Sequence, residues 1–503
     1  MKHLDDVADF VIVGTGAGGA TAARVLAAAG HDVLMLEEGR YLRVPERPRD
    51  MIGSMSSAMR DYASNTTEGS QPFPILQARC VGGATAVNSG IIWRLPDDVR
   101  RDWTENWGLG EMVEERALGD VFDVIERELE VAETAPHLLG GNGSLMAKAC
   151  EVLGLPGKPI TRNAARCQGT AQCMQGCPGE ARQSMDVSYV PRAMADGARL
   201  HTLTRIDKVD IEWGRAMGVS GALIDPDSPR RAVGTFSIRA RRAVIVCASA
   251  IQTPVILRRS GLRGMVGERF QAHPGCAVMG RFKDPVGMGT GGTQTYEVPL
   301  RHRGMKLEAL VLPPEMLSAR IPGAGPSWQQ RLTQMDHYAQ WATMVRMGAK
   351  GRVRPSLFGN GATATVHYNP TRDDLDRTLE GVMLLCKMMF AAGAEEVFPG
   401  VAGFPSILTD VSEVEQLKGH KLEPGHVNYM ASHLFGTACA GTDPARSAVR
   451  PDLRCHDVEG LYVMDSSVFP TNLGVNPQHS IMALTWRAAE RLANVERRAT
   501  AAA

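Results

Sequence analysis

Residues 9–19 have the sequence Asp-Phe-Val-Ile-Val-Gly-Thr-Gly-Ala-Gly-Gly, an apolar, β-branched run followed by a glycine-rich turn. The run predicts a strand, the alanine-rich residues 18–29 have helical periodicity, and residues 32–37 predict a second strand. A strand, a helix and a strand within about thirty residues form the βαβ unit of a nucleotide-binding fold.

The turn itself fits the G-x-G-x-x-G pattern with Gly14, Gly16 and Gly19. Gly14 permits the tight turn, Gly16 lets the backbone approach a pyrophosphate, and Gly19 lets the helix pack closely on the strand. The helix N-terminus then offers free N–H groups and positive partial charge to the phosphates. Glu37 ends the second strand, where its carboxylate can accept hydrogen bonds from a ribose diol. The pattern alone does not distinguish FAD from NAD.

Two further strands are predicted at residues 243–248 and 461–465, each followed by glycine-rich turns and helices. Polar, irregular stretches that contain most of the prolines separate them. We therefore expect an α/β protein with a Rossmann-type nucleotide-binding domain assembled from separated segments and an interleaved α+β substrate domain. The predicted boundaries are 1–95, 200–275 and 430–503 for the first domain, and 96–199 and 276–429 for the second.

The composition argues against several classes of protein. The 503 residues include 55 Lys and Arg and 55 Asp and Glu, so the formal net charge is zero and nucleic-acid binding is not expected. No apolar run approaches the ~18 residues of a transmembrane helix. Residues 1–9 are short and acidic and lead directly into the first strand, which is unlike a signal peptide. The expected location is therefore the cytoplasm.

Three distant stretches carry a resemblance to a known family. Residues 79–94 place an Arg, a Gly-Gly pair and Asn88 in order, and residues 248–262 and 461–471 follow later in the chain. These stretches resemble the two signatures and the closing flavin motif of the glucose–methanol–choline (GMC) oxidoreductases. The second departs from the family at Ser249, where glycine is usual. The resemblance covers the whole chain and implies FAD and oxidation of an alcohol carbon by hydride transfer to flavin N5.

The same resemblance implies how FAD is held. Some relatives attach the cofactor covalently through a histidine just before the signature asparagine, where this chain has Val87, so dissociable FAD is expected. The implied cofactor-binding residues are Gly14, Gly16, Gly19, Glu37, Arg79, Gly82, Gly83, Asn88, Asp465, Asn476 and Pro477.

Oxidation of an alcohol needs a base for the hydroxyl proton, and a neutral imidazole suits that task near pH 7. His433 matches the catalytic histidine of the family in its H-x-x-G-T pattern, and Asn476 matches the second catalytic position. The alternative for His433 is a core histidine. Asn476 would also cap the helix predicted from Pro477 to about Asn494, and its two roles can hold together. Such a helix would direct its positive end at the flavin. His479 and His273 are weaker candidates, expected to be structural.

The resemblance implies a small-molecule alcohol as the substrate. Aromatic residues make up only 5% of the chain, whereas Met alone numbers 25. Sugars often stack on aromatic rings, and Met fills irregular apolar cavities, so a bulky apolar or aromatic alcohol is favoured over a sugar. The methionines considered are Met335, Met344, Met347, Met383, Met388 and Met389, which are otherwise ordinary core residues. Oxygen, another external acceptor or a redox partner protein could take the electrons. A flavin-containing hydroxynitrile-type lyase and a non-catalytic flavoprotein are remote alternatives.

Cys167, Cys173 and Cys177 form a C-x5-C-x3-C cluster. Three thiolates suit a three-iron cluster, or a four-iron cluster with an outside ligand, whereas zinc would need a fourth ligand that is not close by. The spacing is similar to that in the flavin subunit of bacterial glucose dehydrogenases, which implies a sugar dehydrogenase with an iron–sulfur relay. Free thiols or a redox-labile disulfide are the alternatives. The other cysteines, expected to be small buried residues, are Cys80, Cys150, Cys247, Cys276, Cys386, Cys439 and Cys455.

Overall fold

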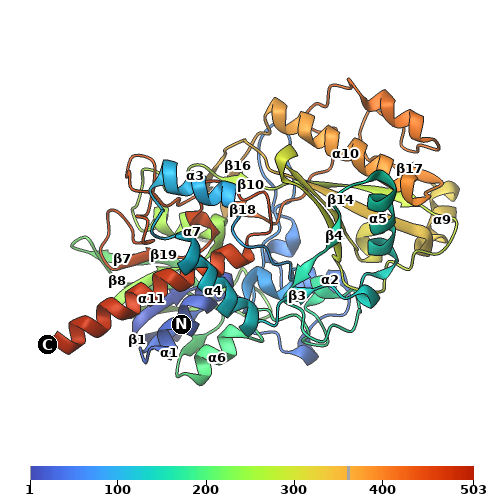
Figure 1. The fold of residues 1–503 in the computed structure, drawn as a ribbon. Coiled ribbons are helices and arrows are strands. Elements are labelled where there is room, and N and C mark those ends of the chain that lie inside the picture. Colours follow the sequence, from blue (N-terminus) through green and yellow to red (C-terminus); the bar gives the residue numbers. More distant parts are fainter. Residues whose placement is uncertain (1, 359–362, 503) are drawn as a thin grey trace.

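The computed structural model describes residues 2–358 and 363–502, with side chains described up to residue 494. Two β-sheets lie next to each other, each covered by helices, and both ends of the chain lie on the side of the first sheet (Figure 1). The α/β class with a Rossmann-type sheet is confirmed.

The first sheet has seven strands in the order β6-β2-β1-β9-β8-β7, and β19 pairs with the C-terminal end of β9. The pairs among β6, β2, β1, β9 and β19 are parallel, as a nucleotide-binding sheet requires, whereas β7, β8 and β9 form an antiparallel extension. The strands are β1 (Lys2–Val13), β2 (Val33–Leu36), β6 (Arg199–His201), β7 (Thr204–Glu212), β8 (Arg215–Ile224), β9 (Ala232–Val246) and β19 (Leu461–Val463).

Strand β1 begins earlier than the sequence pattern indicates. Residues 2–8, interpreted above as an acidic leader, pair in parallel with residues 234–240 of β9. This part of β1 is largely exposed and contains Lys2, His3, Asp5 and Asp6, so it has no continuous apolar run that would mark a strand. The turn after β1 leads into helix α1 (Ala17–Ala28), close to the predicted 18–29.

Helices α1, α6 (Tyr189–Ala195) and α11 (Gln478–Ala502) pack together beside the first sheet (Figure 1). Helix α4 (Glu115–Glu128) packs on α11, and α7 (Ser249–Arg259) packs on β7. The hydrophobic core of this sheet includes Trp103 of α3 (Asp97–Trp107) and Phe122 of α4. Both lie in the segment 96–199 predicted for the substrate domain, so the placement of the domain boundaries stays a prediction.

The second sheet is antiparallel, in the order β17-β11-β14-β13-β12-β4. Helices α5 (Gly140–Leu153) and α10 (Arg372–Ala392) pack against it. A Cβ at Gly381 of α10 would lie 2.5 Å from Oγ1 of Thr343, so this side of the sheet is covered closely. The strands are β4 (Lys158–Pro159), β11 (Gly275–Arg281), β12 (Tyr296–Leu300), β13 (Met305–Ala309), β14 (Tyr338–Val345) and β17 (Glu396–Phe398).

Short elements complete the part of the chain that the structure describes. They are α2 (Met51–Ser57), α8 (Pro314–Ser318), α9 (Pro326–Leu332) and the strand pairs β3 (Ala132–Glu133) with β5 (Thr161–Arg162), β10 (Gln271–Ala272) with β18 (Leu434–Phe435), and β15 (Arg352–Pro355) with β16 (Ala364–His367). Across residues 2–358 and 363–502, no helix has the length and apolar character needed to cross a membrane.

Candidate active site

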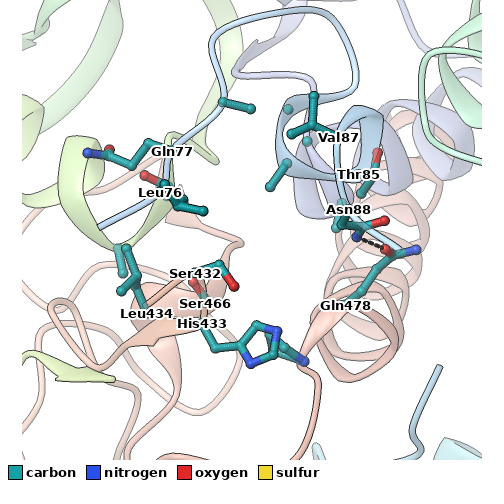
Figure 2. A pocket seen from close by; sticks show the side chains of 18 of the residues that line it. Leu76, Gln77, Thr85, Val87, Asn88, Ser432, His433, Leu434, Ser466 and Gln478 are labelled. Atoms are coloured by element: carbon teal, nitrogen blue, oxygen red, sulfur yellow. Dashed lines mark hydrogen bonds between the residues drawn. The ribbon is translucent and has the colours of Figure 1, made fainter. Parts of the chain in front are cut away.

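A cavity of about 430 Å³ lies where the carboxyl ends of the first sheet meet one face of the second sheet. The turn after β1, residues 83–91, residues 247–256 and the N-terminus of α11 line one part of it. Residues of β11, β13 and β14 line another part, and His433 projects into the space between them (Figure 2). The opening in front of the parallel strands is where such sheets bind nucleotides.

The glycines of the fingerprint have distinct surroundings. Gly14 has a φ of +92°, and a Cβ there would lie 2.5 Å from the carbonyl oxygen of Cys247. A Cβ at Gly19 would lie 1.9 Å from the Gly14 carbonyl oxygen, so helix and strand are in close contact. A Cβ at Gly16 would meet only Gly83, at 3.9 Å. Packing thus requires Gly14 and Gly19, whereas Gly16 keeps its backbone open to the cavity.

Glu37 lies on the cavity wall and is bound at both carboxylate oxygens. One accepts hydrogen bonds from the Thr15 hydroxyl (2.7 Å) and amide (3.2 Å), and the other accepts from the Gly39 amide (3.0 Å). Burial raises the pKa of Glu37. Glu38, which the sequence analysis missed, also lines the cavity and pairs with Arg60. Either carboxylate could accept from a ribose.

The predicted flavin segment reaches the cavity with only part of its residues. Gly83, Val87 and Asn88 line it, and Nδ2 of Asn88 donates to Oε1 of Gln478 at 2.8 Å (Figure 2). Arg79 and Gly82 do not line it. Gly82, with a φ of +92°, shapes the turn in front of the fingerprint by donating its amide to the Thr15 hydroxyl (3.1 Å).

Asp465 links residues 461–471 to residues 248–262, two of the stretches that resemble the GMC family. Its Oδ2 accepts from the Thr253 hydroxyl (2.5 Å) and the Ser249 amide (3.0 Å), and its Oδ1 accepts from the Ser467 amide (2.8 Å). Burial raises the pKa of this carboxyl. Ser249, the departure from the family pattern, has a φ of +80°, which explains why glycine is usual at that position.

His433 and Asn476 face each other on the cavity wall. Nε2 of His433 lies 3.3 Å from Nδ2 of Asn476, and its Nδ1 lies 3.2 Å from the sulfur of Met344. Burial, and to a smaller extent the positive charge of Lys306, lowers the pKa of His433 to about 3. The imidazole is therefore neutral at physiological pH, as a base must be.

Lys306 is a functional candidate that the sequence analysis missed. Its fully buried ammonium donates to Oδ1 of Asn476 (2.6 Å) and forms ion pairs with Glu297 (2.7 Å) and Glu308 (2.5 Å). Burial opposes its charge, but the two carboxylates outweigh that penalty and raise the pKa of Lys306. The ammonium stays charged behind the Asn476 carboxamide.

This lysine fixes the position of a proton. An ammonium only donates, so the carboxamide oxygen of Asn476 must face Lys306 and its NH₂ group must face His433. Nε2 of His433 then accepts, and the proton of the neutral ring resides on Nδ1, beside Met344. The basic lone pair is thereby held on the Nε2 side, next to Asn476.

The two weaker histidine candidates differ in position. His273 lines the cavity, but Nε2 of its buried ring accepts from the Gly474 amide at 2.9 Å, and burial holds its pKa well below the ordinary value. His479 does not line the cavity. It pairs with Glu126 of α4 at 3.0 Å and packs on Phe122, so it joins two helices.

Cys167, Cys173 and Cys177 line a separate small cavity of about 20 Å³. Within the described chain, no group of three or more His, Cys, Asp or Glu could hold a metal ion. The predicted iron–sulfur centre is therefore not supported, and a space suited to one water-sized molecule is too small for a cluster. All three cysteines are free thiols in the structure.

The large cavity fits the cofactor that the sequence resemblance implies. The open Gly16 backbone, the N-terminus of α1 and two carboxylates suit a pyrophosphate and a ribose, while the Val87–Asn88 segment and the N-terminus of α11 form the remaining wall. Asn476 lies just before α11, and its carboxamide is engaged by Lys306 and His433.

Comparisons with known proteins match one family along the chain, its N-terminal part before its C-terminal part. The family model described as GMC oxidoreductase matches residues 8–275 with its N-terminal part and residues 333–485 with its C-terminal part. A GMC-type oxidoreductase of Mycobacterium tuberculosis is 35% identical over 96% of this chain and 75% of its own length. A long-chain-alcohol oxidase of Arabidopsis thaliana is 26% identical over 95% of this chain and 67% of its own length.

Among solved structures, pyridoxine 4-oxidase from Mesorbium loti superimposes with a TM-score of 0.71, covering 96% of this chain and 99% of its own. At 15% identity, this similarity shows a shared fold and no more.

Proposed function

Because this chain belongs to the GMC oxidoreductase family, we propose that it oxidises an alcohol to an aldehyde or ketone with His433 as the base. The observation that carries the proposal is the neutral His433 imidazole on the cavity wall, with Asn476 and Lys306 behind it. FAD, when bound, supplies the acceptor for the hydride that leaves the alcohol carbon.

The residues of the chain divide the proton work. A hydroxyl that accepts from Nδ2 of Asn476 presents its proton to Nε2 of His433. The Lys306 ammonium stabilises negative charge that develops on the alcohol oxygen, because it polarises the Asn476 carboxamide. Asn476 therefore binds and orients the substrate, and His433 takes the proton.

We propose non-covalent FAD held by Gly14, Gly16, Glu37, Gly83 and Asn88. Asp465, Asn476 and Pro477 would complete the site, with Gly19, Arg79 and Gly82 acting on the shape of the surrounding backbone. The lining of the cavity supports this assignment, since Val87 occupies the place where a covalent link would need a histidine.

The substrate that we propose is a bulky apolar or aromatic alcohol. Met344 contacts the His433 ring, and further apolar side chains line the same cavity, namely Leu76, Leu310, Leu312, Met430 and Leu434. The plant relatives named long-chain-alcohol oxidases support the same class.

One observation favours a second candidate, a polyhydroxylated alcohol. Gln340 lines the cavity, and its buried Oε1 has no hydrogen-bond partner among the described residues. Gln294 and Glu308, which bond each other at 2.6 Å, line it as well. These groups could bind substrate hydroxyls remote from the reacting carbon.

Anaerobic mixing of the yellow holoprotein with decan-1-ol, benzyl alcohol and glucose tests both candidates. Loss of visible flavin absorbance with the first two alcohols is expected, and a response to glucose alone would replace the apolar class with the polar one. Release of aldehyde from mandelonitrile without any bleaching would instead show a lyase. Reoxidation by air with formation of hydrogen peroxide would identify oxygen as an acceptor, whereas slow reoxidation would favour another acceptor, including a redox partner protein.

A further inference from the structure

The small cavity beside the cofactor segment has an unusual wall. Its lining combines the three clustered cysteines, Cys167, Cys173 and Cys177, with two arginines, Arg162 and Arg182. Cys173 and both arginines are buried, whereas Cys167 and Cys177 are half-buried. The cavity therefore lies just beneath the surface and is lined by both cysteine and arginine residues.

The two arginines connect this small cavity to residues 86–89, which belong to the segment that lines the cavity of about 430 Å³. Nη2 of Arg162 lies 3.2 Å from the sulfur of Cys173, and its Nε donates to the carbonyl oxygen of Ser89 at 2.8 Å. The Arg182 guanidinium donates to the carbonyl oxygen of Ala86. The Arg182 amide lies 3.5 Å from the sulfur of Cys177.

Neither guanidinium forms an ion pair with a carboxylate of the described residues, although both are buried. The carboxylate that acts on the charge of Arg182 is that of Asp186, which pairs with Arg47 at 2.7 Å. A buried charge needs a counter-ion. The group in that position is the sulfur of Cys173.

Burial alone would raise the pKa of the Cys173 thiol, but the charges of Arg162 and Arg182 outweigh it and hold that pKa below the ordinary value. By contrast, burial raises the pKa of Cys247 and Cys386, because no positive charge in the described part of the chain acts on either thiol to offset it. Thiolates, and not thiols, react with peroxides and other soft electrophiles.

We propose that Cys173 is a thiolate paired with Arg162 and Arg182, and that hydroperoxides oxidise it selectively to a disulfide with Cys177. The cavity has room for about one small polar molecule, which suits a hydroperoxide. Cys177 is the partner because its sulfur lies 3.5 Å from the backbone amide of Arg182, and the charge of Arg182 interacts with both Cys173 and Cys177.

The chemistry balances in two steps. The Cys173 sulfur attacks the distal oxygen of hydrogen peroxide, the O–O bond breaks, and Cys173 sulfenic acid and hydroxide form. The Cys177 thiol then attacks the sulfenic sulfur, the S–S bond forms, and water leaves with the thiol proton. Together the two sulfur atoms lose two electrons, and the peroxide gains both as its O–O bond breaks.

Peptide mapping of the peroxide-treated holoprotein tests the proposal. Trypsin releases residues 167–182 as one peptide, and cyanogen bromide cleaves it after Met174, between Cys173 and Cys177. A Cys173–Cys177 disulfide keeps the two fragments joined until a reductant is added. A Cys167–Cys173 disulfide would let them separate and would overturn the pairing.

Three serine variants complete the test. Cys173→Ser should abolish disulfide formation, Cys177→Ser should leave a sulfenic acid that dimedone traps, and Cys167→Ser should react like the wild type. Arg162→Gln should slow oxidation about tenfold, with Arg162→Lys intermediate if the guanidinium charge is what matters. Equal oxidation of Cys173 and Cys455, or stoichiometric iron and acid-labile sulfide in anaerobically purified protein, would overturn the proposal.

Discussion

Nδ2 of Asn476 lies 3.3 Å from Nε2 of His433, so a carboxamide donates to the atom that would serve as the base. The orientation is imposed from behind, because Lys306 can only donate to the carboxamide oxygen. The proposed chemistry thus depends on three side chains from three separate parts of the chain.

Replacement of the base tests the proposed function most directly. His433→Ala should slow anaerobic flavin reduction by ~10²–10⁴-fold, the usual effect of losing a general base, while FAD stays bound. His479→Gln is the matched control, because that histidine pairs with Glu126 away from the cavity and should change stability without changing the reduction rate. Reduction of His433→Ala at the wild-type rate would show that another group takes the proton.

Lys306→Gln should slow flavin reduction by about tenfold with little change in the dissociation constant of the alcohol. Glutamine can donate or accept, so the Asn476 carboxamide would no longer be held in one orientation. The variant leaves Glu297 and Glu308 without their cation, which costs roughly 3–5 kcal/mol of stability, so rates are compared in the folded, FAD-loaded fraction. Lys158→Gln is the control, because Lys158 is 3.6 Å from Glu297 but does not contact Asn476. Equal rates in both variants would exclude a positioning role.

The pH dependence follows from the pKa of His433, which is lowered to about 3. A histidine serves as base only when neutral, so flavin reduction should stay constant from pH 8 to about pH 4 and decline at lower pH. In Lys306→Gln the lowering effect of the ammonium is lost, so the decline should move to higher pH. Stopped-flow reduction across this range measures both. A wild-type decline centred near pH ~6.5, the ordinary histidine value, would contradict the shielding of His433.

Ser249→Gly should stabilise the protein by about 1 kcal/mol, because a side chain at a φ of +80° is strained and glycine is not. The serine hydroxyl lies 3.4 Å from the Ile251 amide, and losing that weak cap to glycine costs only a few tenths of a kcal/mol. The midpoint of urea unfolding measures the difference. Ser249→Ala keeps the strain and loses the hydroxyl, so it should be less stable than the wild type. If glycine were no better than alanine, strain at this position would be unimportant.

FAD should dissociate when the protein is denatured, since Val87 offers no nucleophile for a covalent link. Acid precipitation is expected to leave all the yellow colour in the supernatant, with a flavin content equal to that of the holoprotein. Colour in the pellet would reveal a bond at another residue.

The nucleotide-binding fold could be predicted from the sequence because steric contacts allow only glycine at key positions of the fingerprint. Gly14 and Gly19 lie where any Cβ would strike a carbonyl oxygen, and continuous apolar runs mark the central parallel strands. The first half of β1 was missed, since its largely exposed residues form no apolar run and are held by pairing with β9 and by ion pairs such as Asp6 with Arg199. Such pairing is a long-range property that no local pattern contains.

The site was predictable only in part for a related reason. Residues 305–309 alternate apolar and polar, which is typical of a strand with one face in water. Here the polar face of β13 is directed at the cavity, and Lys306 is fully buried between two carboxylates. Likewise, the cysteine spacing suggested a metal centre because the sequence does not reveal that Arg162 and Arg182 approach the cysteines.

The pairing of β19 with β9 has a consequence for biosynthesis. β9 pairs with β1 along one edge, but the other edge of its C-terminal end remains open until residues 461–463 emerge from the ribosome. Asp465 and Asn476, on the cavity wall, follow still later. Contacts between residues so far apart in the sequence form slowly. Until they form, a strand edge stays exposed. The nascent chain should therefore depend on chaperones, and should acquire its cofactor only after translation is nearly complete.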